Sequence, residues 1–345
     1  MSAATGYRAV RAGSRFWLYR PKTLRRGVAI AVSIALLGTL ALFLGSYPVG
    51  GHDVLSALTG QVSAEAGFIV GALRLPRILL ALLTGAILGM AGAAMQSVTR
   101  NGLADPGLIG VKEGAVVAIL SLLVFFPSVG NGWYPLAGLL GGGLVAGTVM
   151  LIARSVSGVR FILVGIGVSW MLGAAVSLFV TTARISEVQT AMIWLSGSLH
   201  AASWSGVSIA APWAAFGLLV LLATARSGDV ASLGDVAARG LGVRLGRLDA
   251  LRLAASVAIT AASVAVIGSM GFVGLIAPHF ARFVFGSAQL PLLTGSALIG
   301  GLLVLAADTV GRSAFAPVQI PAGVVMAVIG TPFFLLILWR RRHEI

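Results

Sequence analysis

Eight long stretches of the chain consist of apolar and small residues and contain no acidic or basic side chain. They are residues 28–44, 78–95, 136–152, 161–180, 207–223, 253–267, 292–307 and 324–338. Each approaches the roughly 20 residues that a helix needs to cross the hydrocarbon core of a bilayer. Two shorter stretches, 111–126 and 272–285, are candidates for further spans. Because the apolar residues do not alternate with polar ones, the pattern predicts an all-α integral membrane protein with about ten transmembrane helices.

The composition supports a lipid-embedded chain. Of the 345 residues, 58% are hydrophobic and only 10% are charged, whereas a soluble domain carries about a quarter charged residues. The chain has no cysteine, which excludes disulfides and thiolate metal sites, and its four histidines are dispersed. We therefore expect no metal site, no cofactor and no catalytic centre.

The formal net charge of +14 would suit a nucleic-acid-binding protein, but its distribution along the chain argues against nucleic acid. With ten spans and a cytoplasmic N-terminus, all but four of the 24 Lys and Arg residues fall on the cytoplasmic side. We expect a basic cytoplasmic tail at 1–27 without a cleavable signal peptide, a ten-helix domain at 28–340 and a cytoplasmic tail at 341–345. The expected location is a bacterial cytoplasmic membrane, crossed many times.

Small residues recur at helix-face spacing in two of the predicted spans. Gly85, Gly89 and Gly92 share one span, and the pairs Gly138–Gly142 and Gly143–Gly147 lie in another. Small residues allow helix backbones to approach closely within a membrane. The spacing predicts a tightly packed bundle.

The largest predicted cytoplasmic segment is 226–252, which mixes aspartates with five arginines. Residues 232–243 read as a short helix capped by Ser232 and closed by Gly240, with a second short helix after it. Asp235 and Arg239 stand at i and i+4 and can support the helix as a pair. Because the chain has no soluble domain of its own, we interpret this segment as a docking surface for a partner.

Nine motifs follow one another in an order typical of one family. They are Arg74-Leu-Pro-Arg77 and the segments 100–110, 163–169, 194–198, 237–243, 271–282, 307–312, 320–324 and 330–334. Together they resemble the FecCD-type permeases of iron-siderophore, haem and vitamin B12 ABC importers. The resemblance implies a type II ABC importer permease fold with ten helices, in which spans two to five and seven to ten form an inverted repeat. It also implies a dimer of permeases, two cytoplasmic ATPase subunits and an extracytoplasmic substrate-binding protein. The likeness to the second permease of ferric-enterobactin-type systems favours a heterodimer with a homologous permease over a homodimer.

The resemblance also implies three sets of site residues. Arg74, Arg77 and Arg312 would meet glutamates of the binding protein, with anchoring to lipid phosphate as the alternative. The residues expected to couple to the ATPases are Ser232, Leu233, Gly234, Asp235, Val236, Ala237, Ala238, Arg239, Gly240, Leu241 and Gly242. The cytoplasmic gate would comprise Asn101, Gly102, Leu103, Ser157 and Gly158. Many relatives have proline where Gly102 stands, and plain turns at both gate segments are an equal alternative.

Polar and ionisable residues in the spans are the remaining candidates. Asp308 stands at the end of an apolar span, and we expect it to pair with Arg312 at i+4. The polar positions that could line a substrate path are Ser169, Ser177, Thr181, Thr182, Thr260 and Ser263. Such side chains more often donate hydrogen bonds to carbonyls of their own helix or pack against neighbouring helices.

The predicted function is that of a permease subunit that imports a ferric siderophore or a related iron chelate. Haem and vitamin B12 remain alternative substrates. An ion-gradient-driven transporter would carry buried ionisable residues in its spans, which the long stretches lack apart from Asp308. A membrane enzyme is disfavoured because no catalytic motif is present. A channel would not need the docking segment. The phosphate-binding Gly-x-x-x-x-Gly-Lys-Ser/Thr motif is also missing from the sequence, so a separate subunit would have to hydrolyse ATP.

Overall fold

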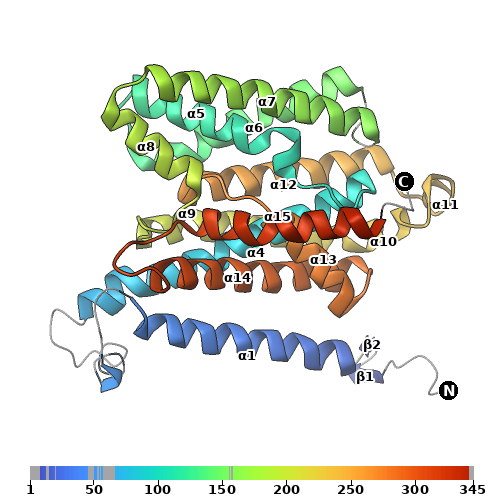
Figure 1. Ribbon diagram of the computed structural model, residues 1–345. Coiled ribbons are helices and arrows are strands. Elements are labelled where there is room, and N and C mark those ends of the chain that lie inside the picture. Colours follow the sequence, from blue (N-terminus) through green and yellow to red (C-terminus); the bar gives the residue numbers. More distant parts are fainter. Residues whose placement is uncertain are drawn as a thin grey trace.

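A computed structural model of the chain describes residues 8–12, 15–19, 21–45, 50–52, 54, 56, 67–154, 156 and 158–341. Helices dominate this part of the chain (Figure 1). The long and medium helices are α1 (Pro21–Phe43), α4 (Leu75–Thr99), α5 (Val111–Phe125), α6 (Tyr134–Ala153), α7 (Val159–Thr182), α8 (Ile185–Ser196), α9 (Trp204–Ala223), α12 (Leu245–Ile267), α13 (Val273–Phe285), α14 (Gln289–Ser313) and α15 (Ala322–Arg341). The short elements are β1 (Arg8–Ala12), β2 (Arg15–Tyr19), η2 (Ile69–Arg74), η3 (Pro106–Ile109), η4 (Asn131–Trp133), α10 (Ala225–Ala231) and α11 (Asp235–Gly240).

All ten apolar stretches predicted from the sequence fold as helices. Within the described residues, eight helices are long and apolar enough to cross a membrane: α1, η2 with α4, α6, α7, α9, α12, α14 and α15. The other two, α5 and α13, have 15 and 13 residues. Each follows a loop that ends in left-handed backbone, at Gly110 (φ 81°) and Phe272 (φ 67°). These loops enter the bundle, so α5 and α13 begin inside it and are shorter than full spans.

The N-terminal region differs from the sequence-based expectation in two ways. Helix α1 begins at Pro21, before the apolar stretch that starts at residue 28. Ahead of it, β1 and β2 pair as an antiparallel hairpin with Arg8 opposite Tyr19. The all-α prediction did not include this hairpin. Its signal was the Phe16-Trp-Leu-Tyr19 run of strand-forming residues that follows Gly13-Ser14.

Glycine contacts hold the centre of the bundle together, where α4 packs against α14, α12, α9 and α13. A Cβ at Gly85 would overlap the carbonyl oxygen of Gly300, and one at Gly89 would overlap that of Ser296. These contacts confirm the close packing predicted for the glycines of this span. Among the described residues the same prediction is wrong for the pair Gly143–Gly147, since a Cβ at either glycine would meet no atom of them within 4 Å.

The helices form two similar groups. α5 packs on α6 as α13 packs on α14, α6 neighbours α7 as α14 neighbours α15, and α4 contacts α14 as α12 contacts α6. Helices α4 and α12 run in opposite directions through the bundle (Figure 1). The arrangement is an inverted repeat of α4–α7 and α12–α15.

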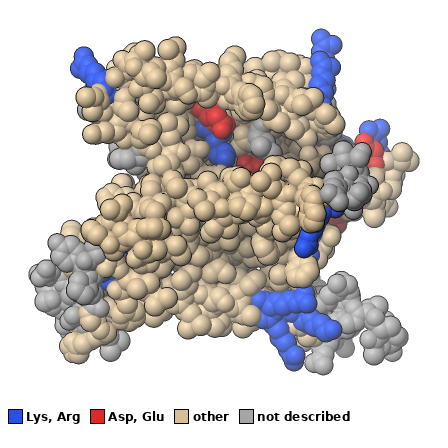
Figure 2. Space-filling model, in the orientation of Figure 1, with Lys and Arg blue, Asp and Glu red and all other residues tan. Residues whose placement is uncertain are grey.

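The two ends of the bundle are formed by different elements. Helix α1 begins and α15 ends at the same end, where α10 and α11 also lie (Figure 1). We call this the α11 end and the opposite one, where α4 begins and α14 ends, the Arg77 end. Most of the face in Figure 2 is formed by uncharged side chains, as a surface in contact with lipid requires.

Candidate functional site

Arg77 and Asp308 form a buried ion pair at the Arg77 end. The guanidinium binds the carboxylate through two nitrogens, with Nε to Oδ2 and Nη2 to Oδ1 both at 2.9 Å. Nη1 of Arg77 also donates to Oε1 of Gln319 at 3.1 Å. The side chains are 13% and 4% exposed. The expected pairing of Asp308 with Arg312 is therefore wrong, because Asp308 binds the arginine of the neighbouring helix α4.

Arg74 and Arg312 instead hold the end of α1. Nη2 of Arg312 donates to the carbonyl of Ala41 at 2.8 Å, and Arg74 donates to the carbonyl of Leu42. These carbonyls belong to the last turn of α1, where intrahelical partners are missing. Both arginines are only 5% exposed. The three arginines do gather at one end of the bundle, but contacts within the chain engage them all, so their docking role stays a prediction.

The expected coupling segment folds as α10, a short connection and α11. Ser232 Oγ donates to the carbonyl of Asp229 and lies at the C-terminal end of α10, while Gly234 (φ 101°) precedes α11. The prediction that Ser232 caps the N-terminus of the short helix is therefore wrong, and the second short helix precedes α11 instead of following it. The end of α11 at Gly240 is confirmed.

Helix α11 presents apolar side chains to its surroundings. Val236 is 89% exposed, and Leu233 and Leu241 are each 65% exposed, whereas Ala238 is fully buried. In Figure 1, α11 projects from the bundle beyond the ends of the long helices. Exposed apolar groups on a projecting polar segment are typical of an interaction surface.

Asp235 ties α11 to the end of α4. Arg100, which follows α4 in a left-handed conformation, donates to Asp235, and Arg239 lies 3.8 Å from the same carboxylate. The expected i,i+4 pair of Asp235 and Arg239 is confirmed. Arg100 is the closer of the two partners of Asp235. The hydrogen bond from Arg100 and its charge lower the pKa of Asp235 below its ordinary value, so the carboxylate is ionised at neutral pH.

Arg252 was missed by the sequence reading. It is 1% exposed, and it donates to Oε1 of Gln289 at 2.6 Å and to Oγ of Ser97 at 3.1 Å. The backbone N–H of Gln289 in turn donates to Asp229 Oδ1 at 2.7 Å. This network joins α4, α10, α12 and α14, so it links the segment at the α11 end to the core. The available signal was an arginine directly before the apolar stretch at 253–267.

The first gate segment, Asn101–Leu103, has ordinary turn geometry. Oδ1 of Asn101 accepts from the N–H of Leu103 at 2.9 Å, and the Asn101 carbonyl accepts from the N–H of Ala104. In the second gate segment, Gly158 (φ 87°) directly precedes α7, and Ser157 lies outside the described residues. The Asx turn accounts for the local structure at Asn101 and Gly102. The gate role of these residues stays a prediction.

The polar positions proposed for a substrate path fall into two groups. Ser177, Thr181 and Thr182 donate to carbonyls of their own helix. Ser169, Thr260 and Ser263 have buried hydroxyls with no hydrogen-bond partner among the described residues. Lys112 and Glu113 also lie within the predicted span 111–126, so Asp308 is not the sole ionisable residue of the spans. Within the described part of the chain, no group of three or more His, Asp or Glu side chains could hold a metal ion.

Comparison with known proteins identifies relatives over nearly the whole chain. Residues 33–340 match the FecCD transport family. The Fe(3+)-citrate import system permease protein YfmE of Bacillus subtilis is 37% identical over 311 residues, which cover 90% of this chain and 93% of the relative. The cobalamin import system permease protein BtuC of Halobacterium salinarum is 40% identical over 281 residues, covering 80% and 75%. A solved inward-facing structure of a transporter assigned to the metal-chelate ABC type superposes with a TM-score of 0.80 at 27% identity, covering 91% of this chain and 98% of that one.

Proposed function

The chain belongs to the FecCD transport family, and we propose that it is the permease subunit through which a ferric siderophore or related iron chelate enters the bacterial cytoplasm. It is a multi-pass membrane protein and a component of a transporter, not an enzyme. The observation that carries the proposal is the family match over residues 33–340 combined with the iron-citrate permease named among the relatives. As an ABC importer permease it works with a partner permease and ATPase subunits.

We assign the α11 end to the cytoplasm. The regions that carry most of the basic residues, including the start of α1 and α10–α11, lie at this end. The ATPases would bind the projecting α11 through Val236, Leu233 and Leu241. Closure of the ATPases on ATP would then push α11 and, through the Asp235–Arg100 and Arg252 contacts, move α4 and α14.

The substrate-binding protein would dock at the Arg77 end. Arg77, Arg74 and Arg312 concentrate positive charge there, which suits glutamates on an approaching protein. Since each arginine already has a partner within the chain, a docking glutamate would add to or displace these contacts. The partner permease would be a homologous, non-identical chain.

Cobalamin is the second candidate substrate, supported by the Halobacterium salinarum relative at 40% identity. An ion-gradient mechanism is less well supported, because the named relatives are permease proteins of import systems. Uptake of a labelled ferric siderophore and uptake of cobalamin can be measured separately, so one transport assay distinguishes the two substrates.

The test is transport in vesicles that contain this chain, the partner permease and the ATPases, with the binding protein on the uptake side. We expect uptake of radiolabelled ferric siderophore that requires ATP and the binding protein. Uptake of cobalamin alone would support the second candidate. Uptake driven by an ion gradient without ATP would contradict the importer assignment.

A further inference from the structure

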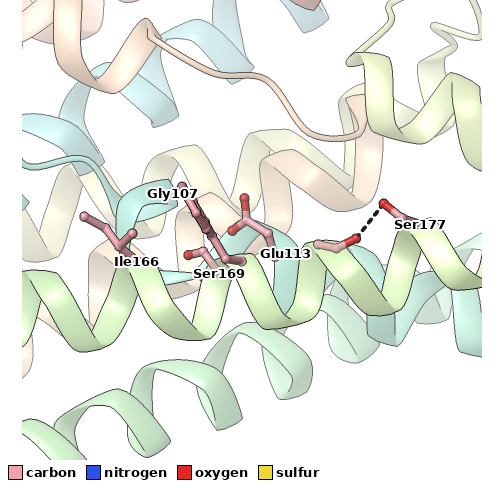
Figure 3. A pocket seen from close by; sticks show the side chains of 7 residues that line it. Gly107, Glu113, Ile166, Ser169 and Ser177 are labelled. Atoms are coloured by element: carbon pink, nitrogen blue, oxygen red, sulfur yellow. Dashed lines mark hydrogen bonds between the residues drawn. The ribbon is translucent and has the colours of Figure 1, made fainter.

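A pocket of about 500 Å³ opens on the surface of α7, away from the arginine cluster and from α11. Its lining residues are Gly107, Glu113, Ile166, Ser169, Trp170, Gly173 and Ser177. Those from α7 recur every three to four residues and form one face of that helix, with Glu113 of α5 beside them (Figure 3). The volume is in the range of small-molecule sites.

The pocket lies at the mid-depth of the neighbouring helices. A Cβ at Gly110 would lie 3.2 Å from Oγ of Ser169, and one at Gly114 would lie 2.7 Å from the carbonyl oxygen of Gly141. Ser169 stands near the middle of α7, and Gly141 stands near the middle of α6. The first turn of α5, which carries Glu113, is therefore far from both ends of the bundle.

Two polar groups of the pocket lack a partner. Glu113 Oε2 and Ser169 Oγ are buried and make no hydrogen bond within the described residues. Leaving such groups unpaired is costly, and each in a native structure calls for an explanation. Ionisable side chains at membrane depth face the protein interior or a water-filled cavity, because lipid cannot solvate them. The mouth of the pocket, where Trp170 is 79% exposed, should therefore open on water or on protein and not on lipid.

Among the described residues, the only positive charge near the pocket that the contacts identify, Lys112, is already engaged. Lys112 lies 3.9 Å from Oδ1 of Asp105 and donates to the carbonyl of Met270 at 3.4 Å. Figure 2 shows acidic and basic side chains together inside a hollow on this face. Asp105, Lys112 and Glu113 together carry one negative charge when both carboxyls are ionised, and none when Glu113 is protonated. An anionic ligand therefore meets no net positive charge from these three side chains in either state.

We propose that this pocket faces the translocation path between the permeases, that it is a contact site for the transported chelate, and that it favours neutral or cationic chelates over anionic ones. The carboxyl of Glu113 accepts hydrogen bonds from amine, amide or hydroxyl groups on the periphery of the chelate, and Ser169 donates or accepts another. The inference rests on the proposed function, since it assumes that an iron chelate is the cargo. A charge-assisted hydrogen bond is about twice as strong as a neutral one, so the carboxylate dominates the discrimination.

The test measures direct binding to the assembled importer in nanodiscs, by quenching of tryptophan fluorescence. The probes are the ferric complexes of one linear trihydroxamate whose terminal amine is free, acetylated or succinylated, which changes the charge on a constant scaffold. We expect the amine form to bind at least about tenfold more tightly than the succinylated form. Glu113→Gln should bring this ratio close to one, and Trp170→Phe should remove most of the quenching.

Two serines of the pocket provide a matched control. Ser169→Ala removes a hydroxyl without a partner and should weaken binding of every probe severalfold. Ser177→Ala removes a hydroxyl already donated to the carbonyl of Gly173 at 3.0 Å, and should change binding less. Equal affinities for the three probes in the wild type, an unchanged ratio in Glu113→Gln, or no binding at all would overturn the inference. A charge-ranked binding series without ATP-driven iron uptake would instead contradict the proposed function and leave the pocket as a cation-selective site.

Discussion

At the scale of single residues, the chain uses its few buried charges as structural connectors. Arg77 joins α4 to α14 through Asp308, Arg252 joins four helices, and Arg74 and Arg312 bind the end of α1. The sequence singled out Arg74, Arg77 and Arg312 because basic residues are rare on the predicted outer side of the membrane. It did not reveal their partners, since Asp308 has an arginine four residues away and another 231 residues away. Only the packing of α4 against α14 decides between them.

The Arg77–Asp308 pair allows docking to be separated from stability. Arg77→Gln and Asp308→Asn both break the buried pair, and each should cost about 3–5 kcal/mol of stability because one buried partner is left alone. Only Arg77→Gln removes the cation. We expect it to weaken binding of the substrate-binding protein to the importer in nanodiscs by about tenfold or more, while Asp308→Asn keeps near-normal affinity. An equal loss in both variants would assign Arg77 a structural role alone.

At the scale of elements, the positions of the helices could be predicted from the sequence. Their lengths, and which helices pack against one another, could not. Continuous apolar sequence specified all ten helices because lipid leaves the backbone little alternative. The re-entrant starts of α5 and α13 depend on loops whose path is fixed by tertiary contacts, so the sequence suggested spans where shorter helices form. Gly85 and Gly89 were interpreted correctly, whereas Gly143 and Gly147 have the same spacing but face open space. Spacing shows that helices can approach, and the partner helix decides whether they do.

Two glycine substitutions should have opposite effects on stability. Gly89→Ala places a methyl group on the carbonyl oxygen of Ser296, and such overpacking typically costs about 1–3 kcal/mol. Gly143→Ala meets nothing within 4 Å and should gain about 0.5–1 kcal/mol, because alanine is the better helix former. Thermal unfolding in detergent measures both. A destabilised Gly143→Ala would mean that this face is covered in the assembled importer.

At the scale of the whole molecule, the bundle places the three arginines Arg74, Arg77 and Arg312 and the projecting α11 at opposite ends. The charge asymmetry of the sequence predicts which of the two ends is cytoplasmic. The projection of α11 could not be predicted from the sequence. Ser232 suggested an earlier start for this helix, whereas Gly234 is the residue that precedes it in the structure. The inverted repeat was also invisible in the sequence, since the two halves share packing relations and not side chains.

The apolar tip of α11 should be necessary for assembly with the ATPases. Val236→Asp changes a side chain that is 89% exposed, so the permease should fold normally. We expect co-purification of the ATPase subunits to fall by about tenfold or more, because the charge must be buried at the interface. Val318→Asp is the matched control at the Arg77 end, where the side chain is 66% exposed, and it should retain the ATPases. Full retention in both variants would contradict the coupling assignment.

The contact between Arg312 and the end of α1 has a consequence for biosynthesis. The first helix leaves the ribosome early, but the arginine that caps its carbonyl at Ala41 is made 271 residues later. Until α14 has been inserted, the end of α1 lacks this partner, and most of α1 is exposed along its length. The hydrogen bond from Arg312 to the end of α1 can therefore form only when the chain is nearly complete. A ribosome-stalled chain ending before Arg312 would hold the end of α1 through Arg74 alone, and the Ala41 carbonyl without its side-chain partner is the kind of feature that membrane quality control can read.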